Sequence, residues 1–120
     1  PYLVQSIHSD GVATYRADTE RRDRIMSTET ARILQEMLRA NVETYYGDEN
    51  FAGFTACAKS GTAEVGGEKK PNAMFTGFVA DEEYPLAFIV AVENAGYGRL
   101  VCVPILAEVL DACKTVLDAE

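Results

Sequence analysis

The sequence predicts an α+β fold in which a three-stranded antiparallel sheet is flanked by helices. Two observations support this class. Apolar residues recur at steps of three and four over residues 27–46 and 99–118, as they do on one face of a helix. Between these segments, residues 54–94 contain three strand-like stretches separated by short turn sequences. With 120 residues and 48% hydrophobic content, the chain suits one packed unit of this kind.

The first 26 residues carry no helical pattern, and we expect extended or loop structure over 1–26. Residues 2–8 are typical of a short extended segment. The stretch 9–11 (Ser-Asp-Gly) predicts a turn, because aspartate and glycine tolerate tight backbone angles. Residues 12–26 are polar and irregular, which predicts a surface loop.

The first predicted helix spans 27–46. Ser27 or Thr28 can cap its first turn, where Glu29 favours the positive end of the helix dipole. Gly47 can supply the left-handed residue that ends it. Its predicted apolar face consists of Ala31, Leu34, Leu38, Val42 and Tyr45.

Three strands and a second helix follow. The strands are predicted at 54–64, 73–79 and 86–93, and the last is a continuous apolar run typical of a buried central strand. The second helix is predicted over 99–118, with Pro104 in its first turns, where a missing N–H costs least. Its predicted apolar face consists of Val103, Leu106, Leu110, Cys113 and Leu117.

Charge and composition disfavour several classes of partner. The net charge of -8 argues against nucleic acid, and the basic cluster at 21–24 contains an acid and is better explained as a solvated loop. Three cysteines without C-x-x-C spacing allow one disulfide at most, and a single histidine, His8, cannot build a multi-histidine metal site. We expect no metal and no cofactor. The longest apolar run is too short to span a bilayer, and no signal peptide is visible, so we expect the chain itself to be soluble.

The segment 53–60 (GFTACAKS) nearly matches the phosphate-binding P-loop, but Ala58 replaces the required glycine. A P-loop also needs a helix that begins at the lysine, and the glycines and proline after Lys59 prevent one. As a strand, the same residues place Lys59 and Gly61 on one face and the two hydroxyls of Ser60 and Thr62 on the other. On these four residues alone, an ordinary amphipathic strand and a ligand-binding strand are equally good interpretations.

The flanking sequence favours the ligand-binding strand. Lys59-Ser60-Gly61 fits the K-[ST]-G element of β-lactamases and penicillin-binding proteins. The segments 59–64 (KSGTAE), 73–78 (AMFTGF) and 89–98 (IVAVENAGYG) resemble, in order, elements of the class B, high-molecular-weight penicillin-binding proteins. The likeness covers essentially the whole chain. One departure is Asn-Ala-Met at 72–74, where many relatives have His-Ala-Trp. The resemblance implies the C-terminal part of a β-lactamase/transpeptidase-like fold.

The resemblance also implies a function for the intact protein: a peptidoglycan D,D-transpeptidase that cross-links stem peptides and is acylated by β-lactams. Lys59 and Thr62 are then the candidate catalytic residues, and Ser60 and Gly61 join them in binding substrate. The Thr62 N–H would form half of the oxyanion hole. No serine in the chain begins an S-x-x-K or S-x-N motif, so the nucleophile is missing and we expect the chain alone to be inactive.

Further expectations concern the parent protein and the rival functions. The resemblance implies an extracytoplasmic parent anchored to the bacterial cytoplasmic membrane, of which this chain is a fragment beginning at Pro1. Strands of the intact fold would cover the strand at 86–93, so its exposed edge predicts self-association of the isolated chain. The alternatives are a non-catalytic binding or assembly module of the cell-wall machinery and, with less support, a nucleotide-binding protein.

Overall fold

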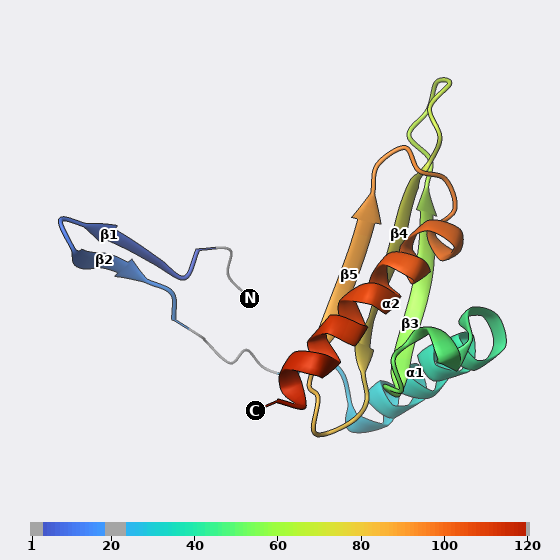
Figure 1. Ribbon diagram of the computed structural model, residues 1–120, viewed down its shortest axis with the longest axis horizontal. Helices are drawn as coiled ribbons and strands as arrows, with labels where there is room; N and C mark the ends of the chain where they lie inside the picture. The colour runs from blue at the N-terminus through green and yellow to red at the C-terminus, as the bar shows by residue number, and fades with distance from the viewer. Residues whose placement is uncertain (1–3, 19–23, 120) are drawn as a thin grey trace.

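The computed structural model describes residues 4–18 and 24–119 (Figure 1). The three-stranded sheet is antiparallel, has the order β3-β4-β5 and is flanked by two helices, which confirms the predicted α+β fold. The elements, in chain order, are β1 (Ser6–Ser9), β2 (Val12–Arg16), α1 (Thr28–Asn41), the π-helical turn η1 (Val42–Tyr46), the 3₁₀ turn η2 (Asp48–Asn50), β3 (Ala56–Ala63), β4 (Asn72–Val79), β5 (Ala87–Val92) and α2 (Gly98–Leu117).

The N-terminal segment forms a β-hairpin, which stands apart from the sheet in Figure 1. Asp10 and Gly11 have φ angles of 52° and 79° and form the predicted turn. The prediction of an irregular loop over 12–26 is wrong for Val12–Arg16, which pair with β1. All side chains of β2 are exposed, so its sequence lacks the alternation of apolar and polar residues that would predict a strand. Residues 21–23 of the basic cluster lie outside the described residues.

The core lies between one face of the sheet and α2, which crosses that face (Figure 1). Phe75 of β4 is at its centre: it is fully buried, and its ring lies 4.9 Å from that of Tyr46 and 6.2 Å from that of Phe88. Leu106 and Leu110, which belong to the predicted apolar face of α2, are buried. Burial of each such side chain stabilises the fold by about 1.5–3 kcal/mol, so this layer holds the sheet and α2 together.

A widened turn, η1, follows α1 and changes which of two neighbouring tyrosines is buried. Ser27 caps the helix by accepting the Thr30 N–H at 3.0 Å, as predicted. At the other end, the Gly47 N–H bonds to Val42 O at 2.9 Å, five residues back, which defines a π turn. This turn rotates the chain so that Tyr46, 8% exposed, enters the core while Tyr45 stays 56% exposed. The prediction of Tyr45 on the buried face is therefore wrong, because it assumed a regular 3.6-residue period. It is also wrong for Ala31 and Leu34, which are exposed on α1, a helix without a fully buried residue.

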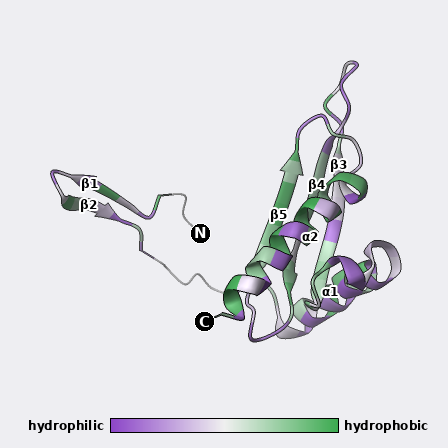
Figure 2. Cartoon of the chain, viewed as in Figure 1, coloured by the Kyte–Doolittle hydropathy of each residue, from purple (hydrophilic) through white to green (hydrophobic). Residues whose placement is uncertain are grey.

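Strand β5 is at the edge of the sheet and not at its centre. Its residues are all hydrophobic (Figure 2), yet their exposure alternates, and Ile89 is 68% exposed. In the described part of the chain no further strand pairs with β5, which agrees with the exposed edge expected for residues 86–93; the buried central position that the apolar run suggests is not present here. Neither of the two long helices is long and apolar enough to cross a membrane, judged on residues 4–18 and 24–119.

Candidate functional site

The predicted site lies on β3, whose outer edge is covered by side chains from α1. In an antiparallel pair, the main-chain groups of alternate residues point toward the partner strand or away from it. The carbonyl oxygens of Ala56 and Ala58 point away from β4. Ala56 O accepts a hydrogen bond from Arg39 Nη1 at 2.9 Å, and Ala58 O accepts one from Asn41 Nδ2 at 3.3 Å. The first half of this edge is therefore satisfied by α1.

Arg39 is held in place by acids beside it. Its guanidinium forms ion pairs with Asp48 and with Glu43, the latter at 3.2 Å. The hydrogen bond from Arg39 holds the pKa of the Asp48 carboxyl below its usual range. The same bond raises the pKa of Arg39, so this cation stays charged while it covers the strand edge.

Tyr46 is the last of the side chains that bond to the outer edge of β3. Its hydroxyl accepts the Ser60 N–H at 2.9 Å and donates to Ser60 Oγ at 3.0 Å. Thr62 is two residues further on, so its N–H points to the same outer edge. No side-chain hydrogen bond within 4–18 and 24–119 reaches that N–H. The predicted oxyanion donor is thus the first outward main-chain N–H of β3 beyond the cover.

Lys59 also reaches this edge. Strand alternation directs its side chain to the face opposite Ser60, but its ammonium donates to Ser60 O at 2.6 Å. The side chain of Lys59 is exposed, whereas Ser60 and Gly61 are half-buried. Because Lys59 lies inside a strand, no helix begins there, which confirms the exclusion of a P-loop. Lys59, Ser60 and the main chain of Thr62 therefore lie together.

The first turn of α2 closes the site on one side. Gly98 approaches so closely that a Cβ built on it would lie 2.3 Å from Gly61 O. Its N–H points to the Thr62 hydroxyl at 3.5 Å, which is long for a hydrogen bond. Only a residue without a side chain fits this contact, so Gly98 fixes how near α2 comes to the Lys59–Thr62 segment.

A hollow of about 280 Å³ opens beside the strand. It contains two cationic side chains, those of Lys59 and Arg99, and no carboxylate. Its lining residues are Asn41, Tyr45, Tyr46, Lys59, Ser60 and Arg99. Two cations and phenol or serine hydroxyls around one hollow favour a ligand that carries negative charge. Gly61 and Thr62 are not part of this lining.

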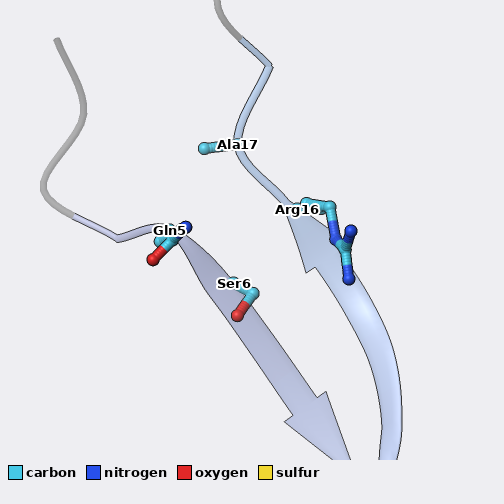
Figure 3. Close-up of a pocket in the computed structure, with 4 residues that line it drawn as sticks. All are labelled: Gln5, Ser6, Arg16 and Ala17. Carbon is cyan, nitrogen blue, oxygen red and sulfur yellow. The ribbon is translucent and has the colours of Figure 1, made fainter. Parts of the chain in front are cut away.

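Two other hollows have less chemistry. One, of about 330 Å³, lies on the hairpin between Gln5, Ser6, Arg16 and Ala17 (Figure 3). Ser6 Oγ lies 3.2 Å from His8 Nε2, but both groups are exposed and no described carboxylate bonds to the ring. The other, of about 430 Å³, is wholly apolar and is lined by Leu86, Val109, Ala112, Cys113, Val116 and Leu117. Neither offers a nucleophile held by an oriented base.

The cysteines are free thiols. Burial raises the pKa of Cys57 and of Cys102, which keeps both protonated and unreactive near neutral pH. Cys113 is half-buried. Within residues 4–18 and 24–119, no three His, Cys, Asp or Glu side chains gather in a way that could hold a metal ion.

Sequence reasoning missed Asn41, Tyr46 and Arg99 as parts of the site. The sequence places Tyr46 only at the end of the helix predicted over 27–46. The one signal that could have identified it is the tyrosine pair directly before Gly47, which offers a hydroxyl in either register of the helix end. Arg99 follows Gly98 at the start of a helix, and no motif marks it.

Comparisons with known proteins agree with this geometry. A family profile described as "Penicillin binding protein transpeptidase domain" matches residues 1–111. The peptidoglycan D,D-transpeptidase PbpA of Mycolicibacterium smegmatis is 30% identical over 100 residues, which are 80% of this chain and 20% of that protein.

Solved structures give the same result. Penicillin-binding protein A from M. tuberculosis, as its imipenem acyl-enzyme, matches 94% of this chain and 26% of its own, with a TM-score of 0.68 and 25% identity. The D,D-transpeptidase domain of a peptidoglycan glycosyltransferase from Eggerthella lenta has the same fold, with a TM-score of 0.65 and 24% identity over 99% of this chain and 27% of that one. The chain thus spans about a fifth to a quarter of these relatives. It belongs to the penicillin-binding protein transpeptidase domain family, of which it represents a part.

Proposed function

We propose that the chain is the C-terminal part of the transpeptidase domain of a class B penicillin-binding protein. In this proposal it supplies the strand Lys59–Thr62 that binds the substrate and β-lactams. The observation that carries the proposal is the outer edge of β3. Side chains of α1 and η1 bond to the main chain of this edge as far as Ser60, and no described side chain bonds to the Thr62 N–H beyond it. In this proposal, the parent protein cross-links peptidoglycan stem peptides, and β-lactams acylate it. The parent lies outside the cytoplasm, anchored to the bacterial membrane.

The reaction needs a nucleophile from elsewhere in the parent. No serine here is followed by lysine at the third position or by asparagine at the second. A serine of the parent attacks the carbonyl carbon of the penultimate D-alanine, and negative charge develops on the carbonyl oxygen. The Thr62 N–H, which points away from β4, supplies one of the two donors that stabilise this oxyanion. The chain alone is therefore inactive.

The same edge suits the carboxylate of the substrate or of a β-lactam. The Lys59 ammonium raises the positive potential there, and it already bonds to Ser60 O. The hydroxyls of Ser60 and Thr62 share one face of the strand and are the donors to the carboxylate. Gly61 carries no side chain, so the substrate backbone can lie against the strand.

The test is acylation of the parent protein by a fluorescent penicillin, followed on a denaturing gel. We expect covalent labelling of the wild-type protein. Labelling should be reduced at least tenfold in Lys59→Ala, because the substitution removes a positive charge from the carboxylate-binding site and from the surroundings of the nucleophile. A folded parent that no penicillin labels, or a parent sequence without an S-x-x-K motif, would contradict the enzymatic function. Either result would favour the alternative, a non-catalytic binding or assembly module.

We also propose that the isolated chain associates with itself through β5. The Val79 N–H bonds to Leu86 O at 2.9 Å, which fixes the alternation of this strand pair. The main-chain groups of Ala87, Ile89 and Ala91 then point outward, and their side chains are exposed. An apolar edge of this kind is a template for another strand.

A further inference from the structure

The hydroxyl of Tyr46 lies between two polar groups of a single residue. It accepts the Ser60 N–H at 2.9 Å and donates its own proton to Ser60 Oγ at 3.0 Å. The phenol is 8% exposed, and its ring packs edge-on against Phe75, with the centroids 4.9 Å apart and the planes at 77°. Packing of the ring therefore fixes the position of the hydroxyl, independently of any ligand.

The direction of these two bonds determines what Ser60 can do. A tyrosine hydroxyl carries one proton, and here that proton is donated to Ser60 Oγ. Ser60 Oγ is thus an acceptor toward Tyr46, and its own proton is left for another acceptor. No described residue accepts it. The bonds run in one direction, from the Ser60 N–H to the phenol and from the phenol to Oγ, so each polarises the next and makes Ser60 a better donor.

The ligand that fits this donor is a carboxylate. The hollow beside Ser60 contains the side chains of Lys59 and Arg99 and no carboxylate of the protein. A hydroxyl that is polarised as a donor and shares a hollow with two cationic side chains is matched by an anionic oxygen, because hydrogen bonds to charged acceptors are the stronger ones.

We propose that Tyr46 is a positioning residue for carboxylate recognition, which it serves by presenting the Ser60 hydroxyl as a donor to the carboxylate of the stem peptide or β-lactam. The inference rests on the proposed function of the Lys59–Thr62 segment. Tyr46 acts on the carboxylate through Ser60, whose hydroxyl it orients.

The experiment compares two reagents on the parent protein. Benzylpenicillin carries the carboxylate, and its methyl ester does not. The second-order rate constant of acylation is measured for both on the wild type and on Tyr46→Phe, which keeps the ring that packs on Phe75. Loss of one neutral hydrogen bond corresponds to a factor of about three to ten. We expect a reduction of that size for benzylpenicillin and less than about twofold for the ester.

Two further variants sharpen the test. Ser60→Ala removes the acceptor of the relay, so adding Tyr46→Phe to it is expected to change the rate constant for benzylpenicillin by less than about twofold. Tyr84→Phe is the matched control: its hydroxyl donates to Asp118 at 2.8 Å and not to Ser60, and its ring packs edge-on against Phe54. It should change neither rate constant.

The outcomes separate the two proposals. If Tyr46→Phe slows both reagents equally, or has additive effects with Ser60→Ala, Tyr46 has only a structural role and the inference is wrong. If it behaves like Tyr84→Phe, the relay does not matter to the ligand and the inference is again wrong. A folded wild-type parent that neither reagent acylates overturns the proposed function, and this inference with it.

Discussion

Replacing Gly98 by alanine should test how the fold supports the site. Gly98 begins α2, and a Cβ there would lie 2.3 Å from both Gly61 O and Met74 O and 3.1 Å from Met74 N. All three are backbone atoms, which cannot rotate away. Since non-bonded heavy atoms settle at about 3.5 Å or more, the start of α2 must move by roughly 1 Å.

Two effects of opposite sign decide the magnitude. Alanine is favoured over glycine inside a helix by about 0.5–1 kcal/mol, and by less at its first residue. Overpacking of this kind costs about 1–3 kcal/mol. We therefore expect Gly98→Ala to lower the free energy of unfolding by about 1–2 kcal/mol, which is a sizeable part of the 5–15 kcal/mol typical of a domain.

Urea unfolding of the proposed parent's transpeptidase domain measures this change. Leu100→Ala is the control, because Leu100 is in the same turn and is 69% exposed, so its loss should change stability little. The acylation rate should also fall in Gly98→Ala, since the displaced helix presses on Gly61 in the middle of the Lys59–Thr62 segment. If Gly98→Ala is as stable as the wild type or more so, helix propensity dominates, and the close contact between α2 and the strand is not present in solution.

Three further predictions follow from the same structure. Iodoacetamide at neutral pH should alkylate Cys113 within minutes and the two buried cysteines only after denaturation, as read by intact mass; equal labelling would contradict their burial. Asp81 accepts the N–H and hydroxyl of Thr55, and these bonds lower its pKa, so its contribution to stability is present above the ordinary carboxyl pKa and is lost as pH falls below about 4. Unfolding of Asp81→Asn should depend less on pH in that range, and an unchanged profile would exclude this role. For the isolated chain, light scattering at micromolar concentrations should show association that Ile89→Lys weakens, and a monodisperse wild-type monomer would exclude it.

Much of the fold could be predicted because the periodicities are strong. The apolar face of α2 and the three strands follow from patterns of three to four and of two residues, and the bounds differ from the prediction by one or two residues. The π turn at 42–46 could not be predicted, because a single widened turn leaves no periodic signal. The hairpin strand Val12–Arg16 was missed because all its side chains are exposed, so no alternation marks it.

The candidate site could be predicted in part. The residues Lys59 to Thr62 were identified from their order, since a motif preserves residue types in sequence. Their partners were not, because Tyr46 and Asn41 reach the strand from an element 14 and 17 residues earlier. Strand alternation alone also places the Lys59 side chain on the face away from Ser60, whereas a long flexible side chain can return over the edge to Ser60 O.

The two edges of the sheet differ in ways that fit the two proposals, a small ligand at β3 and a second polypeptide at β5. On β3, side chains of α1 and η1 bond to the carbonyl oxygens of Ala56 and Ala58 and to the Ser60 N–H, so a pairing strand would have to displace three side-chain hydrogen bonds. Only the end that contains Thr62 remains free, next to a cation, and this limits the edge to a short, anionic partner. On β5, no side-chain cover of this kind is present in the described part of the chain, and Ile89 is exposed. An uncovered apolar edge can pair along its whole length with another strand, and it places no requirement on that strand's charge. The two proposals therefore predict that a short stem peptide or β-lactam binds at β3 and that a longer strand pairs with β5.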